Sequence, residues 1–200
     1  MTKFSPPEFQ CLLRWRLGIP FASPSRFCNG CGSLQDPLGD HALSCHALGL
    51  YTRHNFLRDE LVSQLHKVGL NAYPNGYFPG NPGDHPADIL VADAFDAGQP
   101  VALDISIVHP LMPSRVITTI APGDTAARRE AEKVARYGAC CRNVGWGFMP
   151  VVCETTGAWG KQAQGFISKL AHFGSMHCGD SVSSVSAQGG MSYQLYWLRP

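Results

Sequence analysis

HPADILVADAFDAGQPVALDISIV, residues 85–108, is the stretch that decides the fold. Two apolar runs in it, ILV and ISIV, are each directly preceded by an aspartate, Asp88 and Asp104. Runs rich in β-branched residues on either side of a short polar loop predict a β-hairpin, with strands over residues 87–92 and 101–108. Carboxylates are rare among the core residues of a strand, so this pair needs a chemical explanation.

The two aspartates are expected to face each other across the hairpin. A loop centred near Asp96 places Asp88 directly opposite Asp104, where Cβ atoms lie about 4.5–5.5 Å apart and two negative charges repel. A divalent cation between them reverses the repulsion, and Mg²⁺ prefers such oxygen ligands. Ser106 shares this face, while a register slip of one residue would separate the pair. The alternative is that Asp88 caps a turn and Asp104 lies at a sheet edge, without a metal.

Helical periodicity surrounds the hairpin. The segment RHNFLRDELVSQLHKVGL (53–70) repeats leucine at Leu57, Leu61 and Leu65 and ends near Gly69, which predicts an amphipathic helix with a glycine C-cap. Further helices are expected within residues 6–20 and over 123–141 and 166–173, and further strands within 71–78 and over 147–157.

The helix expected over residues 123–141 has Asp124 as its predicted N-cap. Its predicted inner face consists of Ala127, Ala131 and Val134. The order of all elements predicts an α/β fold. We divide it into an N-terminal helix with a Cys/His-rich loop (1–50), a core (51–173) and a Ser/Gly-rich, mobile tail (174–200).

Charge is distributed unevenly along the chain although the formal net charge is only +1. The segment 84–104 contains aspartates and no lysine or arginine, and basic residues flank it on both sides. This pattern suits a metal site that also holds a polyanion. Ordinary surface charge around an acidic loop is the alternative.

Neither a membrane span nor a signal peptide is expected. No apolar run reaches about 18 residues, and the N-terminus MTKFSPPEFQ lacks the apolar segment of a signal peptide. We therefore expect an intracellular protein whose 8 cysteines stay reduced, some binding metal and the rest simply buried.

Four residues have the spacing of a zinc site: Cys28-x2-Cys31-x9-His41-x3-Cys45. Two close pairs of soft ligands separated by a loop suit tetrahedral zinc. The surrounding loop has no core of its own, so a structural zinc would supply its folding energy. His46, next to Cys45, is an alternative to His41. A catalytic zinc is less favoured, because protein ligands would fill every position.

The order of a helix, PxD on a strand (Asp88) and DxS on the next strand (Asp104) resembles the PD-(D/E)XK nuclease superfamily. That resemblance implies a mixed central sheet flanked by helices, and Mg²⁺ or Mn²⁺ held by both aspartates and the carbonyl of Ile105. The superfamily usually places a lysine two residues after the second acid, where this chain has Ser106. In some branches the lysine lies on the following helix, and Lys133 matches it.

Other residues could assist such a site. Arg129, Lys133 and Arg136 recur at i, i+4 and i+7 and predict a cationic stripe, or else a solvated helix face. Glu60 is a candidate third acid, with a solvated helix acid as the favoured alternative. Glu154 is a weak candidate for the site, with a cap of the TTG turn as the alternative, and His109 is interpreted as a strand-end residue rather than a base.

The motif series CxxC, GDHALSC, RHNFLRD, PADILV, DISIV and AEKVARY, followed by the GFMPVVCETTG strand, resembles the C-terminal end of non-LTR retrotransposon reverse transcriptases with a restriction-like endonuclease. The resemblance covers roughly residues 10–160. It implies that Arg53 and His54 contact nucleic acid or position the site, and that Tyr137 accompanies Lys133 in a KxxxY spacing. It also implies DNA as partner, retroelement RNA as a further one, a larger reverse transcriptase polyprotein, and a nuclear location.

Three functions are compatible with these patterns. The first is a Mg²⁺-dependent DNA endonuclease that nicks a retrotransposon target. The second is a catalytically decayed nuclease fold that acts as a zinc-stapled nucleic-acid-binding module, which the absence of a lysine at Ser106 favours. The third is a zinc-stapled protein-interaction domain, which would show no salt-dependent binding to DNA.

Overall fold

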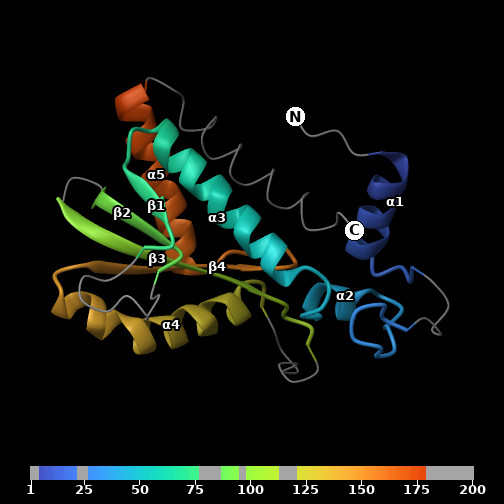
Figure 1. Ribbon diagram of the computed structural model, residues 1–200. Helices are drawn as coiled ribbons and strands as arrows, with labels where there is room; N and C mark the ends of the chain where they lie inside the picture. Colours follow the sequence, from blue (N-terminus) through green and yellow to red (C-terminus); the bar gives the residue numbers. More distant parts are fainter. Residues whose placement is uncertain (1–4, 22–26, 77–86, 95–97, 113–120, 179–200) are drawn as a thin grey trace.

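The computed structural model describes residues 5–21, 27–76, 87–94, 98–112 and 121–178. These residues form a mixed α/β fold in which helices flank one sheet (Figure 1). The helices are α1 (Pro6–Arg16), α2 (Asp40–Ser44), α3 (Leu50–Lys67), α4 (Asp124–Asn143) and α5 (Lys161–Cys178). The strands are β1 (Ala72–Pro74), β2 (Ile89–Ala94), β3 (Gln99–Val108) and β4 (Gly147–Glu154).

The sheet has four strands in the order β1-β2-β3-β4. The pairs β1–β2 and β2–β3 are antiparallel, whereas β3 and β4 are parallel and joined through α4. A parallel pair needs such a crossover, since a tight turn cannot return the chain to the same end of the sheet. The mixed central sheet expected from the sequence is confirmed.

The hairpin register agrees with the prediction. Ile89 pairs with Leu103 and Val91 pairs with Val101. Asp88 directly precedes β2, and its amide donates to the Leu103 carbonyl at 2.9 Å, which places it beside this part of β3.

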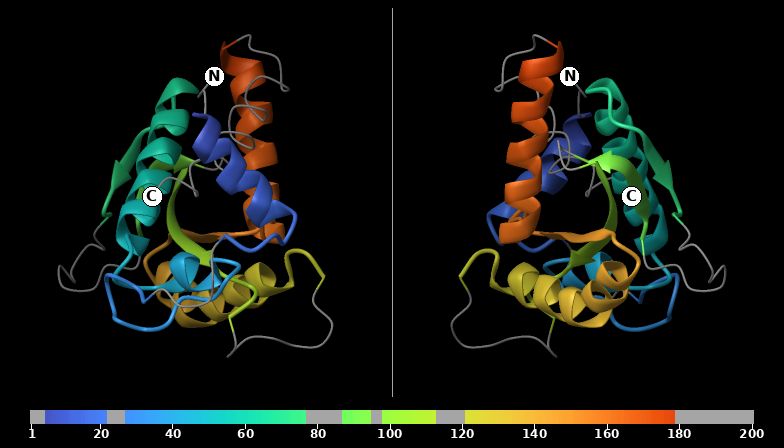
Figure 2. Two further views of the ribbon diagram at one scale, coloured as in Figure 1. Left: turned by 90° about the vertical axis from the view of Figure 1, so that its right-hand side faces the viewer. Right: turned by 90° about the vertical axis from the view of Figure 1, so that its left-hand side faces the viewer.

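Helices cover both faces of the sheet (Figures 1 and 2). Helices α3 and α5 lie on one face and α4 lies on the other. The larger core lies under α3 and α5, where Leu57, Leu61 and Phe166 pack against Ile89 and Leu103 of the hairpin. Asp104 and Ser106 alternate with the apolar residues of β3, so their side chains face α4.

The predicted helix around Leu57, Leu61 and Leu65 is confirmed, and all three leucines are buried. Gly69 adopts a left-handed conformation (φ 84°) just past the helix end, as a glycine C-cap requires. The helix starts at Leu50, slightly earlier than the sequence pattern indicated.

The predicted cap and inner face of α4 are wrong in part. Gly123 is the N-cap, and the buried Glu154 carboxylate accepts hydrogen bonds from the first amides of α4, those of Thr125 and Ala126. Ala131 is exposed, whereas Glu130 is 3% exposed. Its burial has a physical reason, because Glu130 accepts hydrogen bonds from the amides of Gln162 and Ala163 and so caps α5.

Helix α5 runs from Lys161 to Cys178 and is therefore longer than the predicted 166–173. It passes the expected start of the tail at residue 174, and residues 179–200 lie outside the described part of the chain. The Glu130 cap, which comes from a distant element, explains why a local pattern missed the start. Among the described helices, none combines the length and the apolar character needed to cross a bilayer.

Candidate functional site

The four predicted zinc ligands converge. The ligand atoms of Cys28, Cys31, His41 and Cys45 all lie within 4.8 Å of one another. Cys28 Sγ is 3.8 Å from Cys45 Sγ, and Cys31 Sγ is 3.3 Å from His41 Nε2. Three sulfurs and one imidazole nitrogen form the donor set of structural zinc sites. The cluster is thus suited to hold a metal ion, with His41 rather than His46 as the fourth ligand.

Local interactions shape this Cys/His knuckle, residues 27–48, called the knuckle below. The Asp36 carboxylate accepts hydrogen bonds from the amides of Asp40 and His41 and thereby caps α2, which carries His41. Hydrogen bonds from Ser33 lower the pKa of the Cys31 thiol to about 6. Cys31 therefore offers a thiolate, the form that binds metal, at neutral pH.

The acid pair, Asp88 and Asp104, lies where the pairing of β2 with β3 ends, away from the hairpin loop. Asp104 is 7% exposed and its Oδ2 lies 2.6 Å from Nζ of Lys133, on α4. Burial raises the pKa of Asp104 and the charge of Asp88 raises it further, whereas Lys133 and Arg129 act in the opposite direction. The structure therefore places Lys133 on Asp104, with Asp88 near enough for its charge to act on the same carboxyl, while a shared metal site of the two acids stays a prediction.

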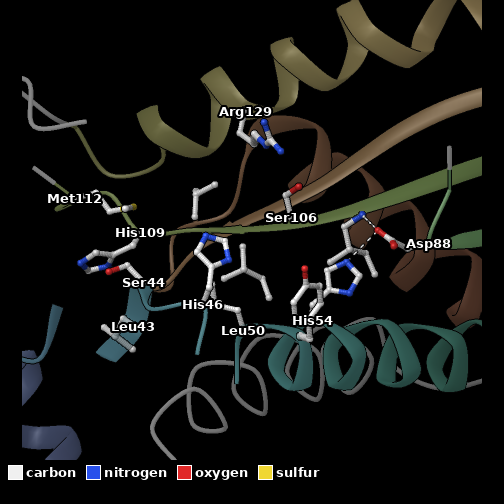
Figure 3. Close-up of a pocket in the computed structure, with 14 residues that line it drawn as sticks. Leu43, Ser44, His46, Leu50, His54, Asp88, Ser106, His109, Met112 and Arg129 are labelled. Carbon is white, nitrogen blue, oxygen red and sulfur yellow. Dashed lines mark hydrogen bonds and ion pairs between the residues drawn. The ribbon is translucent and has the colours of Figure 1, made fainter. Parts of the chain in front are cut away.

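Asp88 is held by two donors that both approach its Oδ2. The Ile105 amide donates at 2.7 Å, and His54 Nε2 lies 3.1 Å away (Figure 3). The hydrogen bond to Asp88 raises the pKa of His54, which favours the imidazolium. His54 thus positions an acid of the pair, while a role of the Ile105 carbonyl as a metal ligand stays a prediction.

Arg53 lies beside the knuckle. Its Nη2 donates to the Leu43 carbonyl of α2 at 3.1 Å, and burial lowers the pKa of its guanidinium. This contact joins α3 to the knuckle, while the role predicted for Arg53 at the site stays a prediction.

The remaining candidates lie farther from the pair. Glu60 accepts a hydrogen bond from Gln64 at 2.7 Å. It lies about 120° around the axis of α3 from His54, at about 100° per residue. Arg136 is exposed and lies over the ring of Tyr137, 5.1 Å from its centroid, and Lys133 Nζ lies 5.5 Å from the same centroid.

A chain of buried polar side chains connects the knuckle to the core, and the sequence did not predict this connection. His109, after β3, lies with Nδ1 2.6 Å from Thr155 Oγ1 and with Nε2 3.2 Å from Asp40 Oδ1 of α2. Thr155 is 4% exposed, so this chain holds two units together rather than presenting a nucleophile. The sequence signal was weak, because His109 and Asp40 are far apart along the chain.

A cavity of about 560 Å³ lies between the knuckle and the core (Figure 3). It follows β3 beyond Leu103, the last residue of β3 that pairs with Ile89 and its neighbours in β2. Its lining consists of Leu43, Ser44, His46, Leu50, Tyr51, His54, Asp88, Ile105, Ser106, Ile107, Val108, His109, Met112 and Arg129. Asp88 thus connects the acid pair to this knuckle–core cavity.

Comparison with known proteins gives no family. No protein family model matches the chain, and no curated protein matches it significantly.

Proposed function

We propose that the protein is a metal-dependent DNA endonuclease with a core of the PD-(D/E)XK type. One observation carries the proposal: Asp88, which directly precedes β2, lies close enough to Asp104 of β3 for its charge to raise the pKa of that carboxyl. Lys133 of α4, whose side chain is 13% exposed, lies 2.6 Å from Asp104. A strand pair that juxtaposes two carboxylates at a cavity sacrifices stability unless a cation or a reaction uses them.

Protein groups supply only part of the ligand set that a hard cation such as Mg²⁺ needs. Among the described residues, the knuckle is the one group of three or more metal-ligating side chains that converge. The acid pair offers Mg²⁺ or Mn²⁺ two carboxylates, from Asp88 and Asp104, and the Ile105 carbonyl and water would complete the shell. When bound, the ion supplies Lewis-acid polarisation of a phosphodiester and acidifies a water molecule.

The chain's own residues divide the remaining work. Lys133 neutralises Asp104, and its Nζ would be free to contact a non-bridging oxygen of the scissile phosphate if a cation took its place on that carboxylate. His54 and the Ile105 amide fix the orientation of Asp88. Preorganised charges of this kind stabilise the transition state because they need no reorientation during the reaction.

The wider assignment follows the resemblance to retrotransposon endonucleases. The substrate is target DNA, retroelement RNA is a further partner, and the domain works within a longer reverse transcriptase in the nucleus. Zinc in the knuckle is structural, as its closed set of four protein ligands favours.

The test is nicking of supercoiled plasmid by the zinc-loaded protein with and without Mg²⁺ or Mn²⁺. We expect Asp88→Asn, Asp104→Asn and Lys133→Ala each to reduce the rate by about 10²-fold or more, since each removes transition-state charge stabilisation. Asp93→Asn, an exposed aspartate on β2, and Lys169→Ala, an exposed lysine on α5, serve as matched controls and keep full activity. Cleavage by Asp104→Asn at the parental rate would refute the proposal.

The same assay separates the second candidate, a decayed nuclease that only binds nucleic acid. The serine at position 106, where related enzymes have lysine, favours this reading. It predicts salt-dependent DNA binding that Asp104→Asn leaves intact or strengthens, together with no metal-dependent nicking by the wild type.

A further inference from the structure

The knuckle–core cavity has a composition that the acid pair alone does not explain. Among its lining residues Asp88 is the only acid, whereas Arg129, His46 and Ser106 present hydrogen-bond donors. Donors that come from the knuckle, β3 and α4 converge on one space (Figure 3). A concave site rich in donors suits an anionic ligand such as a phosphodiester.

The size and walls of the cavity limit what can enter. Its volume of about 560 Å³ lies in the range of sites for single small ligands, about 300–1,000 Å³. Residues 105–108 of β3 and Arg129 of α4 line it together with residues of the knuckle and the start of α3. Tyr51, which is 76% exposed, adds an aromatic ring on which a base can stack.

We propose that the knuckle–core cavity binds one unpaired nucleotide of a DNA strand, adjacent to the phosphodiester that the acid pair cleaves. The assignment rests on the proposed function. Arg129 contacts the neighbouring phosphate, His46 donates to the same nucleotide, and Tyr51 stacks on its base. The knuckle thereby forms one wall of the substrate site in addition to stabilising the fold.

The availability of Arg129 supports this role. Its Nη1 pairs with Glu132 at 2.8 Å, and both side chains are accessible to solvent, at 35% and 62% exposure. Such a surface pair contributes little, so a phosphate can replace the carboxylate at small cost. Arg128, the preceding residue, is exposed and lies outside the cavity lining, which makes it a matched control.

The test measures binding without cleavage, by fluorescence anisotropy of a labelled single-stranded oligonucleotide in Ca²⁺ buffer with zinc retained. We expect Arg129→Ala to bind about tenfold more weakly, and the slope of log K against log salt to fall by about 0.7, the value for one phosphate contact on a single strand. His46→Gln and Tyr51→Ala weaken binding about three- to tenfold. Arg128→Ala and His172→Gln, whose side chains are exposed, bind like the wild type.

The same sequence as a blunt duplex distinguishes an unpaired nucleotide from a general basic surface. The cavity variants should lose less affinity for the duplex than for the single strand. Equal losses on both probes, wild-type binding by Arg129→Ala, or no wild-type binding to the single strand would each overturn the assignment. Absence of metal-dependent nicking refutes the nuclease instead, and cleavage by a protein whose cavity variants bind normally refutes only the nucleotide site.

Discussion

Gly160 and Glu130 show how single residues join distant elements. A Cβ at position 160 would lie 2.1 Å from Glu130 Oε1, the buried carboxylate that caps α5. We therefore expect Gly160→Ala to lower the free energy of unfolding by about 1–3 kcal/mol, through overpacking and a displaced cap. Urea denaturation checks this value.

Gly165→Ala is the matched control, since a Cβ there meets nothing within 4 Å and the residue lies inside α5. It should leave stability unchanged or raise it by up to about 1 kcal/mol, because alanine favours helix over glycine. Equal destabilisation by the two substitutions would show that the Glu130 contact is not what constrains Gly160.

The identity of the fourth zinc ligand, His41 or His46, can also be tested with single substitutions. We expect the purified chain to carry one zinc ion, and His41→Ala to lose it while His46→Ala retains it, because His41 Nε2 converges with the three thiols. Elemental analysis measures this directly. Cys11→Ser, an exposed cysteine outside the cluster, is the control, and zinc loss in His46→Ala alone would contradict the geometry.

Sequence reasoning succeeded for residues whose spacing encodes their chemistry. The Cys/His ligands lie close in the chain, and the short hairpin loop fixes the register of β2 against β3. It missed Glu130, and for Glu154 it gave only the cap of the TTG turn, where Thr156 donates to the carboxylate, and missed that both buried acids cap helices. Their amide partners belong to other elements, and no local pattern contains that information.

At the scale of elements, the polar chain from α2 to the ends of β3 and β4 makes stability depend on pH. Burial lowers the pKa of His109, and the attraction of Asp40 offsets only part of this effect. The unfolded chain then binds a proton more readily than the folded one. The contribution of His109 to folding stability is therefore present at neutral pH and is lost as the pH falls through the ordinary pKa of histidine.

We therefore expect His109→Gln to flatten the loss of stability between about pH 7.5 and 5.5, the range in which histidine titrates. Denaturation at several pH values, with zinc saturating throughout, measures the slope. His172→Gln, an exposed histidine on α5, should keep the wild-type slope. A slope that His109→Gln leaves unchanged would contradict a neutral, buried His109.

At the scale of the whole molecule, the N-terminal unit and the core are tied together. Arg53 bonds to the Leu43 carbonyl, Asp40 lies beside His109, and Arg16 Nη1 donates to the Thr156 carbonyl at 2.9 Å. The element order was predictable from hydrophobic patterns, and the mixed sheet was expected from the resemblance to the nuclease superfamily. These ties were not, because each joins residues that are far apart in the chain through polar contacts.

The measurement that tests the central claim most directly is anomalous diffraction from a crystal of the zinc-loaded protein soaked in Mn²⁺. We expect a manganese peak about 2.0–2.3 Å from a carboxylate oxygen of Asp88 and of Asp104, with Lys133 displaced from its present 2.6 Å contact. An Asp93→Asn crystal should show the same peak and an Asp104→Asn crystal none. If the soaked wild type holds no manganese between the two carboxylates, while Lys133 stays on Asp104, the account of this site is contradicted.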